Sequence, residues 1–175
     1  MKIAIDIGHA HQTGAIGCGL YEHTECAGIA TLLYRELEKI GHSPTIIDYP
    51  TKSNAEDLRQ TIDTVNSLNI DLGISLHCDC ATTPKPKGAH VIYFPGSRLG
   101  SRFASFVAPN LAVIFPGRAK IAVGRTNLAI LSQTKAPWIL CECGFLTNPH
   151  DAAIIRDQKH LIASAIADGI AAAQD

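Results

Sequence analysis

Four residues with side chains that bind metals or accept protons are spread along this chain of 175 residues. His9, His77 and Glu142 each end or follow a short apolar run, and Glu22 follows a glycine-rich loop. Two imidazoles and one carboxylate are the ligand set of a catalytic zinc site, which leaves a fourth position for water. A further carboxylate can take up the proton of that water. We therefore predict that His9, Glu22 and His77 bind Zn2+ and that Glu142 is the catalytic base of a hydrolase.

Glu142 is the candidate base because of where it stands. It ends the apolar run 137–141, which has no Lys or Arg beside it. Burying an unpaired carboxylate is costly, so a role as proton acceptor explains the residue better than a structural role.

Other residues compete for the ligand roles. Glu25 lies three residues after Glu22, so both could face one side of a helix. The glycines of segment 14–19 favour Glu22, because a flexible loop can deliver it to a cation held by His9. His11 would share a face with His9 in an extended segment. We interpret four further histidines as ordinary loop or core residues: His23, His90, His150 and His160.

Short apolar or β-branched runs bounded by turn residues predict five strands. They cover residues 2–7, 43–48, 70–76, 89–94 and 137–142. Helical spacing of apolar residues predicts a long helix over 26–40, ended by Gly41, and a second helix that begins with a capping box at Ser53 and Glu56. A weaker helix over 97–108 is expected to end at Pro109.

The end of the chain reads as a further helix. Asn148-Pro149 resembles an N-cap followed by a proline in the first turn, and isoleucines recur every four residues at 162, 166 and 170. Strands alternating with helices predict an α/β fold with a mostly parallel twisted sheet and helices on both faces. Ligands gather beyond the carboxyl ends of the strands in such sheets. His9, His77 and Glu142 would meet there.

Length and composition indicate one domain over residues 1–175. A hydrophobic content of 46% is ample for one core. The net charge of −1 and the pI near 6.7 give no electrostatic footprint for nucleic acid or for an anionic membrane surface. No apolar run approaches the roughly 20 residues that span a bilayer. Met1-Lys2 leads directly into the first strand, so we expect no signal peptide. We also expect no membrane insertion, and we expect the protein to be a monomer.

Six cysteines lie close to the candidate site residues. A disulfide framework is typical of short secreted chains without a core, so we expect free thiols here. Side chains alternate along a strand, and Cys141 and Cys143 should therefore point away from Glu142 and pack as small apolar groups. The alternative is a thiolate ligand or a redox-sensitive pair.

These phrases together resemble the zinc-dependent N-acetylmuramoyl-L-alanine amidases of the Amidase_3 family, found in bacterial wall-remodelling enzymes and phage endolysins. The resemblance covers nearly the whole chain. It rests on the order and spacing of segments 5–9, 14–17, 75–77 and 142–148, with Glu22 between the second and third. The chain departs from the family in Ala10-His11, where a second glycine is usual, and in Cys78-Asp79-Cys80, where an asparagine is favoured.

The resemblance implies that His9, Glu22 and His77 hold zinc and that Glu142 is the catalytic glutamate. The bond that is cut would be the amide between the lactyl group of N-acetylmuramic acid and L-alanine. The substrate would be peptidoglycan or muropeptides. The protein would act at the bacterial cell wall, either secreted, in the periplasm or delivered by a phage. Two alternatives stay open. One is a zinc peptidase that cuts within the stem peptide, and the other is a non-catalytic wall-binding domain.

Overall fold

The computed structural model describes residues 1–10, 13–50 and 53–174. Its centre is a six-stranded sheet with the strand order β4-β1-β5-β8-β6-β7. β4, β1, β5 and β8 are parallel, β6 pairs antiparallel with β8, and β7 runs parallel to β6. The predicted single α/β domain with a mostly parallel sheet is confirmed. The strands are β1 (Lys2–Ile7), β4 (Ser43–Ile47), β5 (Leu72–Asp79), β6 (His90–Tyr93), β7 (Ala122–Gly124) and β8 (Trp138–Phe145).

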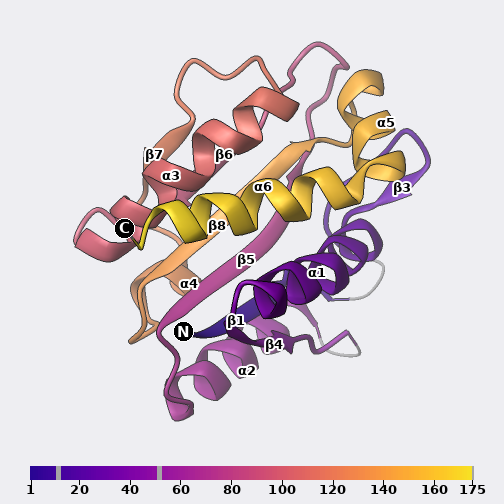
Figure 1. Ribbon diagram of the computed structural model, residues 1–175. Helices are drawn as coiled ribbons and strands as arrows, with labels where there is room; N and C mark the ends of the chain where they lie inside the picture. The colour runs from indigo at the N-terminus through magenta and orange to yellow at the C-terminus, as the bar shows by residue number, and fades with distance from the viewer. Residues whose placement is uncertain (11–12, 51–52, 175) are drawn as a thin grey trace.

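Helices cover both faces of this sheet, as predicted (Figure 1). Three long helices pack together on one face, with α6 (Lys159–Ala172) between α1 (Glu22–Lys39) and α3 (Arg98–Ile114). The shorter α2 (Asn54–Ser67) and α4 (Ala129–Ser132) lie on the opposite face. α5 (Pro149–Asp157) follows β8, and a small hairpin of β2 (Ile16–Gly17) and β3 (Leu20–Tyr21) precedes α1. The sequence patterns did not predict this hairpin, β7 or α4.

The alternation of side chains along the strands divides the core in two. Ile5, Ile74 and Leu76 belong to the larger core, which lies under α1, α3 and α6. Leu140 and Trp138 belong to the smaller core with residues of α2 and α4. Towards the carboxyl ends of β5 and β8, this second face carries polar side chains instead.

Local signals in the sequence explain where α2 and α5 begin. The capping box at α2 is present, since the Ser53 side chain accepts from the Glu56 backbone N–H and the Glu56 side chain accepts from the Ser53 backbone N–H. Asn148 caps α5 by accepting from the backbone N–H groups of His150 and Asp151. These predictions are confirmed.

The expectation that Pro109 ends its helix is wrong, because α3 continues to Ile114. Proline removes one backbone donor and leaves the carbonyl of Ser105, four residues earlier, without a helical partner. Both Pro109 and Ser105 are exposed, so water can satisfy that carbonyl. The buried Val107 and Leu111 hold the helix on the core across the proline.

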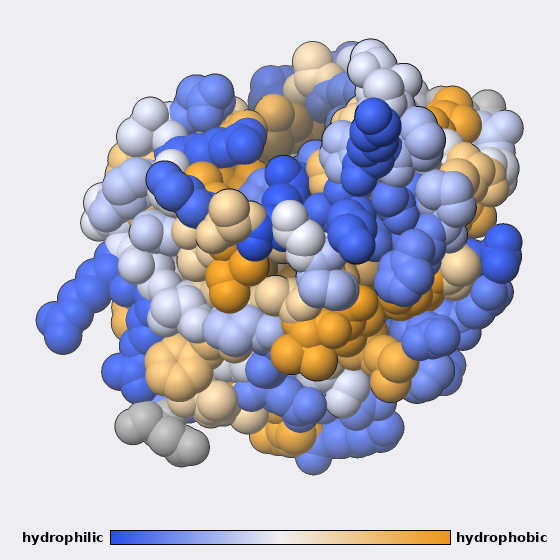
Figure 2. Space-filling view, turned by 90° about the horizontal axis from the view of Figure 1, so that it is seen from above, coloured by the Kyte–Doolittle hydropathy of each residue, from blue (hydrophilic) through white to orange (hydrophobic). Residues whose placement is uncertain are grey.

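The surface is mixed in polarity. Seen from above, hydrophilic residues cover most of the visible face, and apolar residues gather in small groups between them (Figure 2). Single exposed apolar side chains such as Val113 are normal on protein surfaces. Within the part of the chain that the structure describes, no helix has both the length and the apolar character needed to cross a membrane.

Gly73 in β5 gives a direct test of this packing. A Cβ atom there would lie inside the ring system of Trp138, which is almost fully buried. We predict that Gly73→Ala lowers the free energy of unfolding by about 3 kcal/mol or more, measured by urea denaturation. Gly28→Ala in α1 is the control, because its Cβ would meet only the flexible end of Lys159 and alanine favours the helix. Equal stability of the two variants would contradict the packing described for β5 and β8.

Candidate metal centre

Glu22 is the first residue of α1, and its carboxylate is almost fully enclosed, with the residue 2% exposed. Oε2 accepts from the Ala15 backbone N–H (2.6 Å), and Oε1 accepts from the Cys78 backbone N–H (3.0 Å). The β2–β3 hairpin turns the chain between Ala15 and Glu22, and the Glu22 N–H donates back to the Ala15 carbonyl. The loop and β5 therefore fix the carboxylate from two sides.

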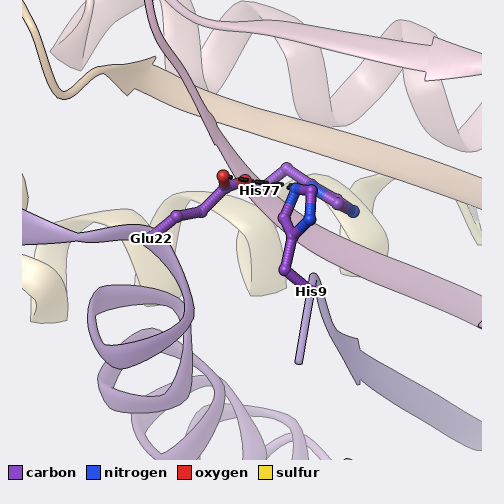
Figure 3. Close-up of side chains that lie close together, drawn as sticks. All are labelled: His9, Glu22 and His77. Atoms are coloured by element: carbon purple, nitrogen blue, oxygen red, sulfur yellow. Dashed lines mark hydrogen bonds and ion pairs between the residues drawn. The ribbon is translucent and has the colours of Figure 1, made fainter. Parts of the chain in front are cut away.

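The two imidazoles face this carboxylate from different strands (Figure 3). His9 follows β1, and its Nε2 lies 3.3 Å from Glu22 Oε2. His77 projects from β5, and its Nδ1 lies 3.0 Å from Glu22 Oε1. The ring centroids are 5.0 Å apart at an interplanar angle of 79°. Three distant segments of the sequence thus meet at one point.

Two glycines make this approach possible. A Cβ atom on Gly8 would lie 2.6 Å from Nδ1 and from Nε2 of His77, so only glycine leaves room for that ring. Gly14 has a positive φ of 85°, and a Cβ there would lie 2.7 Å from Glu22 Oε2 and 2.8 Å from His9 Cδ2. Gly8 and Gly14 are therefore required because the backbone at both positions lies in close contact with the side chains of the cluster.

The electrostatics of the cluster favour a positive charge at its centre. Burial by itself lowers the pKa of His77, but its hydrogen bond to Glu22 and the charges of Glu142, Glu22 and Asp6 outweigh burial and raise that pKa to about 9. Burial by itself raises the pKa of Glu22, but the hydrogen bond and charge of His77 lower it overall. Two imidazoles held against one ionised carboxylate form an environment that a bound cation would satisfy.

The donor set fits a divalent metal. Ligand atoms of His9, Glu22 and His77 all lie within 4.8 Å of one another. Imidazole nitrogen and carboxylate oxygen are the donors that zinc takes in catalytic sites with an open position. All six cysteines are free, and Cys78, Cys141 and Cys143 are buried in the larger core on the opposite face of β5 and β8. The three predicted residues are brought together, and their role as ligands stays a prediction.

Glu142 lies in β8, directly beside His77 of β5 and His90 of β6 in the register of the sheet. Its Oε2 is buried and has no hydrogen-bond partner among the described residues. Burial raises the pKa of Glu142 to about 7, although the charge of His77 opposes this effect. A carboxyl group with a pKa near neutral can take up and return a proton at neutral pH.

The strands that carry His77 and Glu142 extend further than the sequence predicted. β5 and β8 were expected to end at residues 76 and 142 but continue to Asp79 and Phe145. A register shift after His77 and the positive φ of Gly144 (88°) disturb the ladder without ending it. Because side chains alternate along both strands, His77 and Glu142 project from the face of the sheet on which α2 lies.

An Asp79–Arg118 pair beside Glu142 was not predicted. Asp79 and His77 share a face of β5, and the Arg118 guanidinium donates to Asp79 and lies 4.6 Å from the centre of the Phe145 ring. The Arg118 charge also favours the ionised form of Glu142. Alternation of side chains along β5 could have identified Asp79. Arg118 comes from a distant loop, and no local pattern in the sequence links it to Asp79.

The competing residues have other partners or lie elsewhere. Glu25 contacts Lys159 Nζ at 2.6 Å rather than the cluster. His23 Nε2 lies 3.0 Å from Asp48 Oδ1. His90 is buried 3.6 Å from Asp79, and His160 is exposed. His11 lies outside the described residues.

Comparisons with known proteins place these features in a family. The model of the N-acetylmuramoyl-L-alanine amidase family, Amidase_3, matches residues 3–172. N-acetylmuramoyl-L-alanine amidase LytC of Bacillus subtilis is 29% identical over 174 residues, which is 95% of this chain and 34% of the relative. A germination-specific N-acetylmuramoyl-L-alanine amidase of the same organism is 27% identical over 69% of this chain and 52% of its own length. The chain therefore spans between about a third and a half of these curated relatives.

Solved structures agree with the sequence relatives. The catalytic domain of the CD27L endolysin, which targets Clostridia difficile, has a TM-score of 0.89 at 28% identity and covers 98% of this chain and 97% of its own. The CwlD amidase from Clostridioides difficile shares the fold with a TM-score of 0.90 at 20% identity, over 99% of this chain and 98% of its own. The chain belongs to the Amidase_3 family of N-acetylmuramoyl-L-alanine amidases.

Proposed function

We propose that this chain is a zinc-dependent N-acetylmuramoyl-L-alanine amidase domain. It hydrolyses the amide between the lactyl group of N-acetylmuramic acid and the L-alanine of the stem peptide in peptidoglycan or in muropeptides, as a monomer acting at the bacterial cell wall. His9, Glu22 and His77 hold the zinc, and Glu142 is the catalytic residue. The observation that carries the proposal is the convergence of two imidazoles on a buried carboxylate, beside a Glu142 oxygen on the next strand that has no partner among the described residues.

The reaction needs a polarised carbonyl, an activated water and a proton for the leaving nitrogen. When bound, zinc supplies the Lewis acid that polarises the carbonyl and makes water more acidic. Glu142 accepts the proton of the attacking water and later donates it to the nitrogen of the departing L-alanine. Ala15 and Cys78 hold Glu22 through their backbone N–H groups, which fixes the carboxylate towards the imidazoles.

Digestion of purified peptidoglycan tests the bond that is cut. We expect glycan strands free of peptide together with peptides that carry a new amino-terminal L-alanine, identified by mass spectrometry. A chelator should abolish these products, and added zinc should restore them. Cleavage inside the stem would instead show a peptidase, and wall binding without products would show a non-catalytic binding domain.

Glu142→Gln separates chemistry from metal binding. The amide keeps the shape of the side chain but cannot accept the proton, so kcat should fall at least about a hundredfold. Zinc content per chain, measured by atomic absorption, should equal that of the wild type. Near-wild-type turnover in this variant would remove Glu142 from its assigned role.

Gly8→Ala tests the positioning of His77. The added methyl group must displace the imidazole that lies over Gly8, so we predict a loss of zinc affinity of tenfold or more, measured by competition with a chromophoric chelator. Gly28→Ala in α1, whose added methyl group would meet the side chain of Lys159 and not the cluster, should bind zinc like the wild type. If Gly8→Ala bound zinc with unchanged affinity, His77 would not be a ligand in the position described.

A further inference from the structure

A cavity of about 180 Å³ adjoins the candidate metal centre on the side of β1 and α2. It shares His9 and His77 with the ligand set, so a molecule bound at the cluster has direct access to it. Its other walls come from the end of β1, the first turns of α2, and α4. The residues that line it are Asp6, Gly8, His9, Asn54, Asp57, Leu58, His77 and Ile130.

Asp57 is the unexplained polar group of this cavity. The residue is only 5% exposed, and its Oδ1 has no hydrogen-bond partner in the described part of the chain. Asp6 differs, because Ser75 Oγ donates to its Oδ2 at 2.6 Å and Trp138 Nε1 donates to that Ser75 oxygen at 2.9 Å. A buried carboxylate oxygen without a partner is costly, and a ligand that donates a hydrogen would satisfy it.

The remaining walls combine an apolar surface with one amide. Leu58 and Ile130 contribute the apolar side chains. Asn54 uses its Oδ1 to accept from the Ala10 backbone N–H (2.9 Å) and from Thr13 Oγ1 (2.5 Å), which leaves its Nδ2 as a donor. The Asp57 acceptor, the Asn54 donor and the apolar wall are the complement of an acetamido group, with its N–H, its carbonyl and its methyl.

The order of the strands gives the direction of the substrate. Glu142, which must reach the leaving nitrogen, lies on β8. In the sheet, β5 lies next to β8, and β1 lies beyond β5. The amine half of the substrate therefore lies towards β8. The acyl half, which carries the muramyl sugar, then points towards β1, α2 and the cavity.

The covalent distances agree with this direction. In a muramyl peptide five bonds separate the scissile carbonyl carbon from the acetamido nitrogen at C2 of the sugar, a span of about 5–6 Å. A carbonyl placed at His9 and His77 would thus bring the acetamido group to a cavity that begins at the same two residues.

We propose that this cavity is the muramyl subsite and binds the 2-acetamido group, whose N–H donates to Asp57 Oδ1 and whose methyl packs against Leu58 and Ile130. The inference rests on the proposed function and names the part of the substrate that the site recognises. The cavity then selects peptidoglycan whose muramyl residues are N-acetylated. Asp57 and Ile130 are specificity-determining residues.

Calorimetry on the zinc-loaded protein tests this subsite without turnover. The probes are N-acetylmuramic acid, muramic acid with its free amine, and lactic acid, which share the lactyl carboxylate. We expect the wild type to bind N-acetylmuramic acid at least tenfold more tightly than either of the other two. Equal affinities would overturn the proposal, and tighter binding of muramic acid would show a cation site instead.

Two variants address the residues separately. Asp57→Ala removes the acceptor and Ile130→Trp fills the cavity, and each should lower the affinity for N-acetylmuramic acid about tenfold while lactic acid binds unchanged. Asp63→Ala is the matched control, since this exposed residue lies on the same helix, outside the cavity, and its ion pair within the described residues is with Arg59. Wild-type affinity in both variants, with folding verified by circular dichroism, would overturn the subsite. Absence of amide hydrolysis by the wild type would count against the proposed function alone, because the binding preference is measured independently.

Discussion

The burial of the Glu22 carboxylate is the constraint on which the rest of the structure depends. A charge that is almost completely removed from water must be compensated by close hydrogen bonds or by opposite charge. Two backbone N–H groups and two imidazoles meet that requirement here. They come from three separate parts of the chain, so the hairpin before α1, the end of β1 and the carboxyl end of β5 must all be in place for the charge to be tolerated. The glycines at positions 8 and 14 are needed because these segments approach one another so closely.

The two faces of β5 and β8 separate chemistry from packing. His77, Asp79 and Glu142 project on the face of α2, whereas the cysteines beside them project into the larger core. Cys78 Sγ lies 4.0 Å from Cys26 Sγ on α1, one turn after Glu22. Burial raises the pKa of the thiol groups of Cys141 and Cys143, which keeps them protonated. The thiols that flank the site in the sequence therefore act as small apolar groups behind it.

Much of the fold follows from local patterns that act over a few residues. The apolar runs of β1 and β4, the capping box of α2 and the Asn148 cap were identified because propensity and packing agree there. The sequence was misleading at Pro109, where burial of Val107 and Leu111 outweighs one lost backbone hydrogen bond. It was also misleading at the ends of β5 and β8, since pairing with neighbouring strands extends them beyond their apolar runs.

The residue types of the candidate site and their meeting at the carboxyl ends of the strands could be predicted, but the neighbours that surround them could not. His9, Glu22 and His77 stand in recognisable phrases, and the geometry brings them together. The Asp79–Arg118 pair and the Asp57 oxygen that has no partner among the described residues depend on which loops and helices meet in space, and nothing local in the sequence reports that.

The central claim is that His9, Glu22 and His77 hold a zinc ion through nitrogen and oxygen. Zinc K-edge X-ray absorption on the zinc-loaded protein tests it most directly. We predict a coordination shell of nitrogen and oxygen alone at about 2.0–2.2 Å, with the multiple scattering of two imidazoles. A sulfur scatterer at about 2.3 Å would place a cysteine in the coordination shell and would contradict the account.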